Sequence, residues 1–237
     1  MKLFKSSIDV ISKLDQYYSN SDLSYIYKIN REKLVKIINT FELIQTTNQI
    51  TIDDWDIIEK GLHENWFEIY FTHVGEYLAL LEPEHPEISK RLLALMASKK
   101  YIIRRNIVDI CMLFINKTFS RAILKIGVQD KSYRVFENAF YIISTNYIND
   151  TELMSLVNNQ LNLIPESEQK NDYLRSLELV KKGYLINAIE GNRIEFEIVM
   201  NRKHNNEYLC FSMPKEEFEK IVDIEKYVED VRIKQRR

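Results

Sequence analysis

The chain has 237 residues, a formal net charge of −2, five glycines and four prolines. A charge this close to zero excludes both a polyanion mimic and a general nucleic-acid binder. The shortage of glycine and proline favours long helices with few irregular loops, and the length suits one elongated domain or one domain with an appendage.

Apolar residues recur at helical spacing through the first 190 residues. Thr51 or Asp53 is expected to cap the third helix, because short polar side chains accept hydrogen bonds from the first turn. In chain order, the pattern predicts helices over residues 8–18, 34–44, 53–81, 92–96, 102–114, 123–128, 135–143, 151–161 and 173–189.

The period of the apolar pattern changes after Gly191. Apolar and charged residues alternate over 194–198, which predicts a strand, and 208–211 predicts a returning strand. A last helix is expected to begin at Pro214. We therefore expect a mainly α fold with one domain over 1–190 and a hairpin-plus-helix appendage over 191–237.

Residues 92–146 contain one pattern twice, at an offset of 32 positions. The shift places Leu92 on Leu124 and Tyr101 on Tyr133, and Asn106 falls on Asn138 in the same way. A fixed offset between two helix–turn–helix units is typical of a helical repeat array. Two helices alone cannot bury such an apolar stripe, so neighbouring units are expected to stack.

The repeated residues resemble a HEAT-type repeat. In the second unit Asp130 occupies the turn, Val135 follows five positions later and Ala139 holds the small position. In the first unit Ile103 and Arg104 hold the Val-Arg pair. Three positions depart from the family pattern, namely Ser98, Ile107 and Phe136. The resemblance implies an α-solenoid.

Acidic residues concentrate in the segment from Asp53 to Glu87. Ten carboxylates there face only one cation, Lys60, which gives the segment a net charge of −9. We interpret part of this segment as a candidate surface for a protein partner of opposite charge. Its candidate residues are Asp53, Asp54, Asp56, Glu59, Glu82, Glu84 and Glu87.

Basic residues concentrate in the next segment, from Lys90 to Glu137. Eleven cations face three carboxylates, a net charge of +8. Two interpretations stay open: neighbouring repeats neutralise one another through surface ion pairs, or the basic residues form an alternative binding surface. The alternative surface consists of Lys99, Lys100, Arg104, Arg105, Lys131 and Arg134.

The sequence contains no motif that predicts catalysis or a cofactor. Its glycines are scattered singly, so no phosphate-binding loop is present. Glu82 and His85 have the Glu-x-x-His spacing of di-iron bundles, but prolines flank the motif and we expect an ordinary turn. Cys111 lies on an apolar helix face and is expected to be a reduced, buried thiol. We expect no metal, no cofactor and no enzymatic activity.

The pattern as a whole favours a protein-binding module of the helical-repeat type. A bacterial adaptor would fit, and so would an immunity-like inhibitor that covers a basic toxin with its acidic segment. The alternative is a nucleic-acid-binding HEAT-like protein that uses residues 90–134. No apolar run approaches the roughly 18 residues of a membrane span, and the start of the chain lacks a secretory pattern. We therefore expect a cytoplasmic location and no membrane contact.

Overall fold

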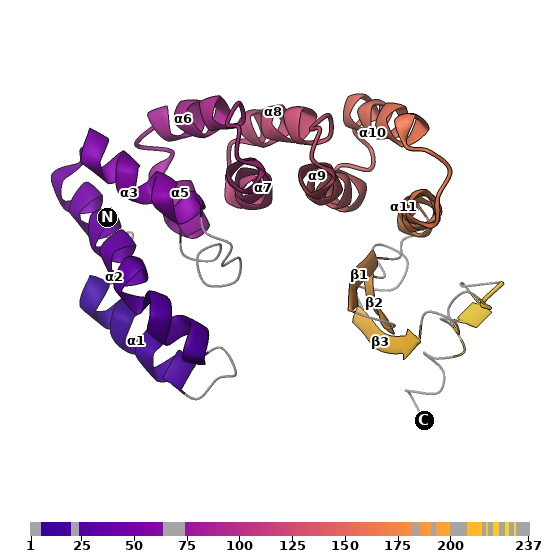
Figure 1. Ribbon diagram of the computed structural model, residues 1–237, viewed down its shortest axis with the longest axis horizontal. Coiled ribbons are helices and arrows are strands. Elements are labelled where there is room, and N and C mark those ends of the chain that lie inside the picture. The colour runs from indigo at the N-terminus through magenta and orange to yellow at the C-terminus, as the bar shows by residue number, and fades with distance from the viewer. Residues whose placement is uncertain are drawn as a thin grey trace. The chain divides into compact units, whose positions relative to one another are not determined.

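The computed structural model describes residues 6–19, 24–63, 74–181, 185–190, 193–199 and 208–214, with a few positions after 216. The chain divides into two compact units, Met1–Ile142 and Ile143–Arg237, and each is described by itself. Helices dominate the described residues (Figure 1), so the prediction of a mainly α protein is confirmed. None of the described helices combines the length and apolar character that a bilayer-crossing segment needs.

The first unit begins with three helices, α1 (Ser7–Ser19), α2 (Ser24–Thr47) and α3 (Ile52–Leu62). Helix α2 contacts both of its neighbours. Its stripe is buried as the spacing predicts, since Leu34 and Phe41 each expose only 1% of their surface. The helix begins ten residues before the predicted start at residue 34.

Thr51 is the N-terminal cap of α3, as the sequence predicts. Its hydroxyl accepts a hydrogen bond from the backbone N–H of Asp54, at 3.2 Å. The Asp54 carboxylate in turn accepts from the Thr51 backbone N–H at 2.8 Å and from its hydroxyl at 2.7 Å. This reciprocal pair is a capping box, which satisfies two of the unpaired donors at the start of the helix.

The rest of the first unit is a series of short helices. Helices α6 and α8 share one layer, and α7 and α9 lie in the layer beneath (Figure 1). Helix α7 ends earlier than predicted and passes into a 3₁₀ turn, η2 (Cys111–Leu113). The bounds are α5 (Glu76–Leu81), α6 (Glu87–Leu95), α7 (Tyr101–Ile110), α8 (Lys117–Gly127) and α9 (Tyr133–Asn146), the last of which ends in the second unit.

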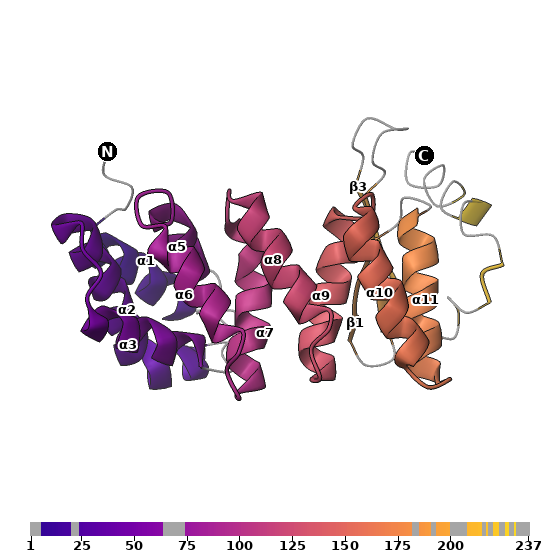
Figure 2. The same ribbon diagram turned by 90° about the horizontal axis from the view of Figure 1, so that it is seen from above.

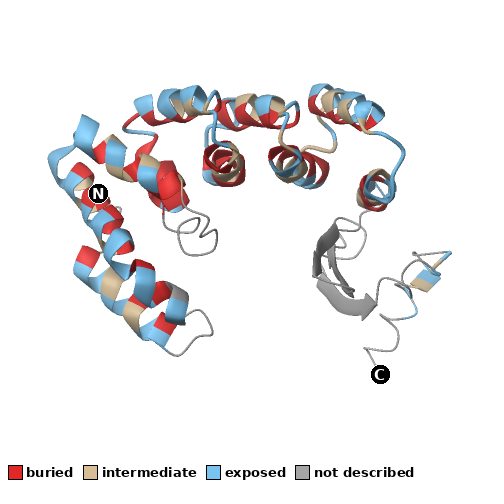
Figure 3. Cartoon of the chain, in the orientation of Figure 1, coloured by how far each residue is buried: buried red, intermediate tan, exposed pale blue. Residues whose placement is uncertain are grey.

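The apolar faces of these helices meet in one core, which Figure 3 marks by burial. Ile107, Val108 and Ala139 are all fully buried. The three helices approach closely at Gly127, where an added Cβ would lie 2.7 Å from Val108 and 3.1 Å from Ala139. A larger side chain at this crossing would force neighbours apart, and dense cores tolerate such a change poorly.

The second unit contains α10 (Thr151–Leu163), α11 (Glu168–Lys181) and a sheet. Asp150 caps α10 by accepting a hydrogen bond from the backbone N–H of Leu153, at 3.2 Å. Helix α11 contacts the first strand of the sheet. Figure 2 shows α10 and α11 beside one another in a second view of this unit.

The sheet corrects two predictions. Helix α11 ends at Lys181, so the predicted helix over 173–189 is wrong, and β1 (Leu185–Glu190) takes its last third. Strand β1 pairs antiparallel with β2 (Arg193–Val199), which pairs antiparallel with β3 (Tyr208–Pro214). The expected two-stranded hairpin is therefore a three-stranded sheet in the order β1-β2-β3.

The local sequence explains this error. A glycine followed by asparagine is typical of a helix end, but such a two-residue link also joins antiparallel strands. Glu190 pairs with Arg193 across that link. The expected domain boundary at 190 falls inside the sheet. The predicted last helix lies largely outside the described residues, as do residues 64–73 of the predicted third helix.

Candidate functional site

Two of the predicted acidic surface residues are buried and serve the fold. Asp54 exposes 6% of its surface and Glu82 exposes 7%. The Asp54 carboxylate is committed to the α3 capping box. One Glu82 oxygen accepts hydrogen bonds from the Ser89 hydroxyl at 2.7 Å and the Asn116 amide at 3.1 Å. Because neither carboxylate faces solvent, their assignment to a binding surface is wrong.

A third acidic residue, Glu59, already has a partner within the first unit. Its carboxylate accepts a hydrogen bond from Arg91 Nε at 2.6 Å. The Arg91 guanidinium also lies over the Trp55 ring, 6.0 Å from its centre. This pair joins the acidic segment to the basic segment, so part of the charge is neutralised internally. Four of the predicted acidic residues remain exposed, namely Asp53 and Asp56 on α3 and Glu84 and Glu87 before and at the start of α6.

Arg104, predicted to lie on the basic surface, is instead buried with 4% of its surface exposed. Its Nε and Nη2 donate to the two carboxylate oxygens of Asp130, at 2.6 and 2.8 Å, and its Nη1 donates to the backbone oxygen of Ser98. The hydrogen bond to Asp130 raises the pKa of Arg104. Arg104 therefore ties the α6–α7 turn to the α8–α9 turn and is not available to a partner.

Arg105 is half-buried and belongs to a second internal cluster. Its Nε lies 3.9 Å from a carboxylate oxygen of Asp109, and the Asn138 amide donates to the other oxygen at 2.7 Å. Burial raises the pKa of Asp109 to about 7, against the opposing effects of the Arg105 charge and the Asn138 hydrogen bond. This carboxyl is therefore poised to change its charge near neutral pH.

The remaining four predicted basic residues, Lys99, Lys100, Lys131 and Arg134, are exposed. In the described part of the chain, no carboxylate forms an ion pair with any of them. They flank the two turns that Arg104 joins. Together with two tyrosines they form what we call the basic–aromatic edge, defined as Lys99, Lys100, Tyr101, Lys131, Tyr133 and Arg134.

The tyrosines hold Arg134 in place. Arg134 Nη1 donates to the Tyr101 hydroxyl at 2.8 Å, and its Nε donates to the Tyr133 hydroxyl at 3.2 Å. The guanidinium lies 5.6 Å from the centre of the Tyr101 ring and 5.8 Å from that of Tyr133. The tyrosines were not among the predicted site residues. The available signal was that both occupy the same position of the repeat, Tyr101 directly after Lys100 and Tyr133 two residues after Lys131.

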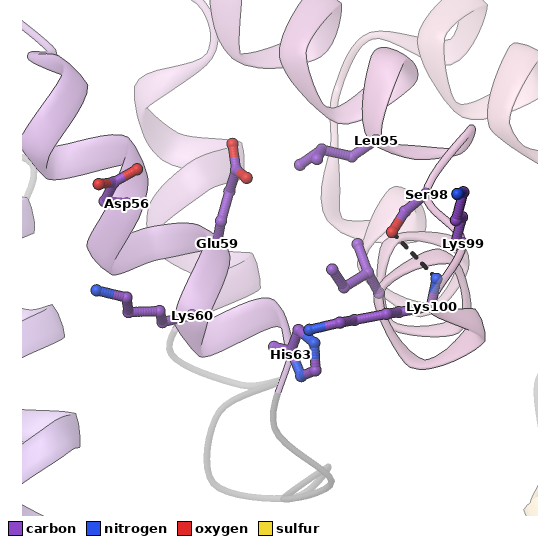
Figure 4. A pocket seen from close by; sticks show the side chains of 9 residues that line it. Asp56, Glu59, Lys60, His63, Leu95, Ser98, Lys99 and Lys100 are labelled. Atoms are coloured by element: carbon purple, nitrogen blue, oxygen red, sulfur yellow. Dashed lines mark hydrogen bonds between the residues drawn. The ribbon is translucent and has the colours of Figure 1, made fainter.

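An open cleft of about 650 Å³ adjoins this edge in the first unit (Figure 4). One wall is the C-terminal half of α3, which contributes Asp56 and Glu59. The opposite wall is the turn before α7, which contributes Lys99 and Lys100. Figure 4 shows the Lys100 side chain pointing toward His63 across the cleft. The other lining residues are Lys60, Leu95, Ser98 and Ile103.

The cleft brings together residues from both predicted surfaces. The acidic and basic residues were predicted to be alternative surfaces, whereas Asp56 and Glu59 of the first set and Lys99 and Lys100 of the second line opposite sides of one cleft. A ligand that fits it must offer groups of both signs, because a purely anionic ligand would meet carboxylates on the α3 wall.

The structure also shows the surroundings of two reactive residue types that the sequence analysis considered, a cysteine and a histidine. Cys111 is a free thiol, and burial raises its pKa. His85 is buried beside Glu87, with its Nδ1 3.1 Å from the Glu87 carboxylate. Within the described ranges, no group of three or more His, Cys, Asp or Glu side chains is arranged to hold a metal ion.

No protein-family model, curated protein or solved structure matches the chain.

Proposed function

We propose that the chain is a non-enzymatic protein-binding module of the helical-repeat type, and that α6–α9 are two copies of a HEAT-like repeat. Helices α7 and α9 begin at Tyr101 and Tyr133, which the sequence offset equates. Each of the equated asparagines donates a hydrogen bond to an earlier helix, although the acceptors differ. Asn106 donates to the Leu62 backbone oxygen of α3, and Asn138 donates to Asp109 of α7. Each asparagine thus joins its helix to an element that precedes it in the chain, which supports a stacked array.

One observation carries the choice of partner class: the cleft is lined both by carboxylates, Asp56 and Glu59, and by lysines, Lys60, Lys99 and Lys100. A protein surface readily offers both signs of charge, and such complementarity gives an interface its specificity. The edge beside the cleft adds exposed tyrosine and arginine, two residue types that are enriched in protein interfaces. The partner would contact the cleft and the basic–aromatic edge together.

A second candidate function, nucleic-acid binding, is favoured by the edge alone. Four exposed cations, none of which pairs with a carboxylate of the described residues, and two tyrosines at one edge resemble the charge and stacking pattern of single-strand binders. The adjoining cleft weakens this candidate, because Asp56 and Glu59 would face the phosphates of any strand that continued into it.

Within the protein-binding proposal, both a cytoplasmic adaptor and an immunity-like inhibitor remain candidates. An inhibitor that used only the acidic segment would offer a partner fewer free carboxylates than the sequence of that segment suggests. Asp54 and Glu82 are buried, and Glu59 is paired with Arg91. The basic–aromatic edge therefore has the larger part in the proposed contact.

A capture experiment with matched charge reversals tests the proposal. The tagged protein is incubated in nuclease-treated extract of its source cells at physiological salt, and the bound proteins are identified by mass spectrometry. We expect a specific partner whose capture falls in both Asp53→Lys/Asp56→Lys and Lys99→Glu/Lys100→Glu variants. The loss should appear mainly as slower association and should shrink at high salt.

The control variant is Asp9→Lys/Glu32→Lys, which makes the same charge change as Asp53→Lys/Asp56→Lys at two exposed positions outside the cleft. It should capture the partner as the wild type does. Capture that disappears entirely after nuclease treatment would favour the nucleic-acid candidate. Capture that falls equally in the control would show that the contact does not depend on this site.

A further inference from the structure

The basic–aromatic edge and its cleft are complementary to a particular kind of polypeptide. We propose that this site binds an extended acidic segment of the partner protein, and that a cationic group at one end of the segment lies in the cleft against Asp56. The inference rests on the protein-binding function proposed above and names the chemistry of the partner.

The charge of the edge is the first argument. Elsewhere in the basic segment, Arg91, Arg104 and Arg105 each face a carboxylate of the first unit. The side chains of Lys99, Lys100 and Lys131 face none in the described part of the chain. Among the described residues, no carboxylate compensates their charge, so carboxylates of a partner are the groups that would complement it.

Internal hydrogen bonds hold the backbone of the two turns that bear these lysines. The Ser98 hydroxyl accepts a hydrogen bond from the Lys100 backbone N–H at 3.3 Å. Asp130 accepts one from the Ser132 backbone N–H at 2.8 Å, while it also holds Arg104. The two turns are therefore fixed and joined before any ligand arrives. A site that needs little ordering on binding retains more of its interaction energy as affinity.

Arg134 is arranged to receive a carboxylate. A guanidinium has five N–H donors. The tyrosine hydroxyls accept hydrogen bonds from two of them, one N–H on Nε and one on Nη1. The remaining donors on the Nη atoms can form the paired hydrogen bonds that bind carboxylates strongly. The tyrosine rings restrict the orientation of the guanidinium.

A peptide suits the site better than a nucleic acid for two reasons. Base stacking needs an open aromatic face, but the Arg134 guanidinium lies over the rings of Tyr101 and Tyr133. In addition, exposed Asp56 in the cleft repels phosphate but attracts a lysine, an arginine or a terminal amine. An acidic segment with a cationic end satisfies both parts of the site.

Fluorescence anisotropy with three labelled probes tests this inference on the full chain. The probes are a polyglutamate peptide that ends in lysine, the same peptide without the lysine, and a poly-deoxythymidine oligonucleotide. Wild type should bind the lysine-ended peptide most tightly. The Lys99→Glu/Lys131→Glu variant should lose about tenfold or more in affinity for both peptides, as expected for reversed contact charges.

The matched control is Lys28→Glu/Lys36→Glu, which reverses two exposed lysines of α2 in the same unit. It should lose less than about twofold, because charges farther from the ligand than the Debye length are screened at physiological salt. The Asp56→Lys variant should weaken only the lysine-ended peptide. Circular dichroism and urea midpoints establish that each variant is folded.

Three results would overturn the inference. Equal losses in the two double-lysine variants would mean that the peptides bind through overall charge. Tighter binding of the oligonucleotide, lost in Lys99→Glu/Lys131→Glu, would assign the edge to nucleic acid. Failure of both peptides to bind, while the protein still captures its partner through the cleft, would reject the acidic segment and leave the proposed function intact. If the protein also fails to capture a partner from extract, both this inference and the proposed function are rejected.

Discussion

The acidic and basic segments of the first unit have net charges of opposite sign and similar size, −9 and +8, but their charged residues have different roles in the fold. Of the acidic candidates, Asp54 and Glu82 are buried in local hydrogen bonds and Glu59 is paired with Arg91. Of the basic candidates, four stay exposed around two joined turns, and no carboxylate in the described part of the chain pairs with them. The comparison teaches that a run of like charges is not by itself a surface, because some members cap helices or tie turns together.

The largest expected effect separates a buried charge from an exposed one. Arg104→Ala should destabilise the protein by about 3–5 kcal/mol, because it leaves the buried Asp130 carboxylate without its partner. Arg91→Ala removes a more exposed arginine from Glu59 and should cost about 0–1 kcal/mol. Urea unfolding monitored by circular dichroism measures both. Equal urea midpoints for the two variants would show that the buried ion pair contributes no more to stability than the exposed one.

A smaller, pH-dependent effect tests the internal cluster around Asp109. Burial raises the pKa of this carboxyl to about 7 in the folded protein, above its ordinary value of 3.8. The folded state therefore binds this proton more tightly than the unfolded state. As a result, the free energy of unfolding falls as the pH rises from about 4 through about 7. Asp109→Asn, which cannot ionise, should flatten the loss of melting temperature between about pH 5 and pH 8.

Asp15→Asn is the control for this measurement. The hydrogen bond from Arg31 lowers the pKa of Asp15 below 3.8, so the stability linked to that group is lost only when the pH falls toward the acid range. Its substitution should leave the slope between about pH 5 and pH 8 unchanged. An unchanged slope in Asp109→Asn would contradict the account of the buried carboxyl.

The smallest effect distinguishes two neighbouring acidic residues on α3. Asp54→Ala removes the capping box and should cost about 1–2 kcal/mol. Asp53→Ala removes an exposed charge that interacts favourably with the helix dipole, worth roughly 0.3–1 kcal/mol. Thermal unfolding of the two variants measures the difference. A larger loss for Asp53→Ala would mean that the roles of these carboxylates are reversed.

Local patterns predicted much of the helical structure. Thr51 was a predicted cap, and Asp54 three residues later completes the capping-box pattern, so its structural role could have been inferred from the same four residues. The helices predicted over 102–114 and 135–143 correspond to α7 and α9, which begin at Tyr101 and Tyr133, one and two residues earlier than predicted. Strand β1 was missed because Ile186 and Ile189 fit a helical stripe and a short strand alike.

The site depended on information that no local pattern contains. Arg104 and Asp130 are separated by 26 positions, and only the packing of the helices makes them a buried pair. The same packing leaves Lys99 and Lys131 exposed, although each is only one or a few residues from a member of that pair. The cleft joins α3 to the turn before α7, so its two walls could not be related before the fold was known.

Lysine footprinting tests the central claim most directly, because it needs no prior identification of the partner. The purified protein is briefly acetylated in buffer and in nuclease-treated extract, and the reaction of each lysine is measured by mass spectrometry. The account predicts that extract protects Lys99, Lys100 and Lys131 while the exposed α2 lysines, Lys28 and Lys36, react as they do in buffer. Protection of the α2 lysines with an unprotected edge would contradict it.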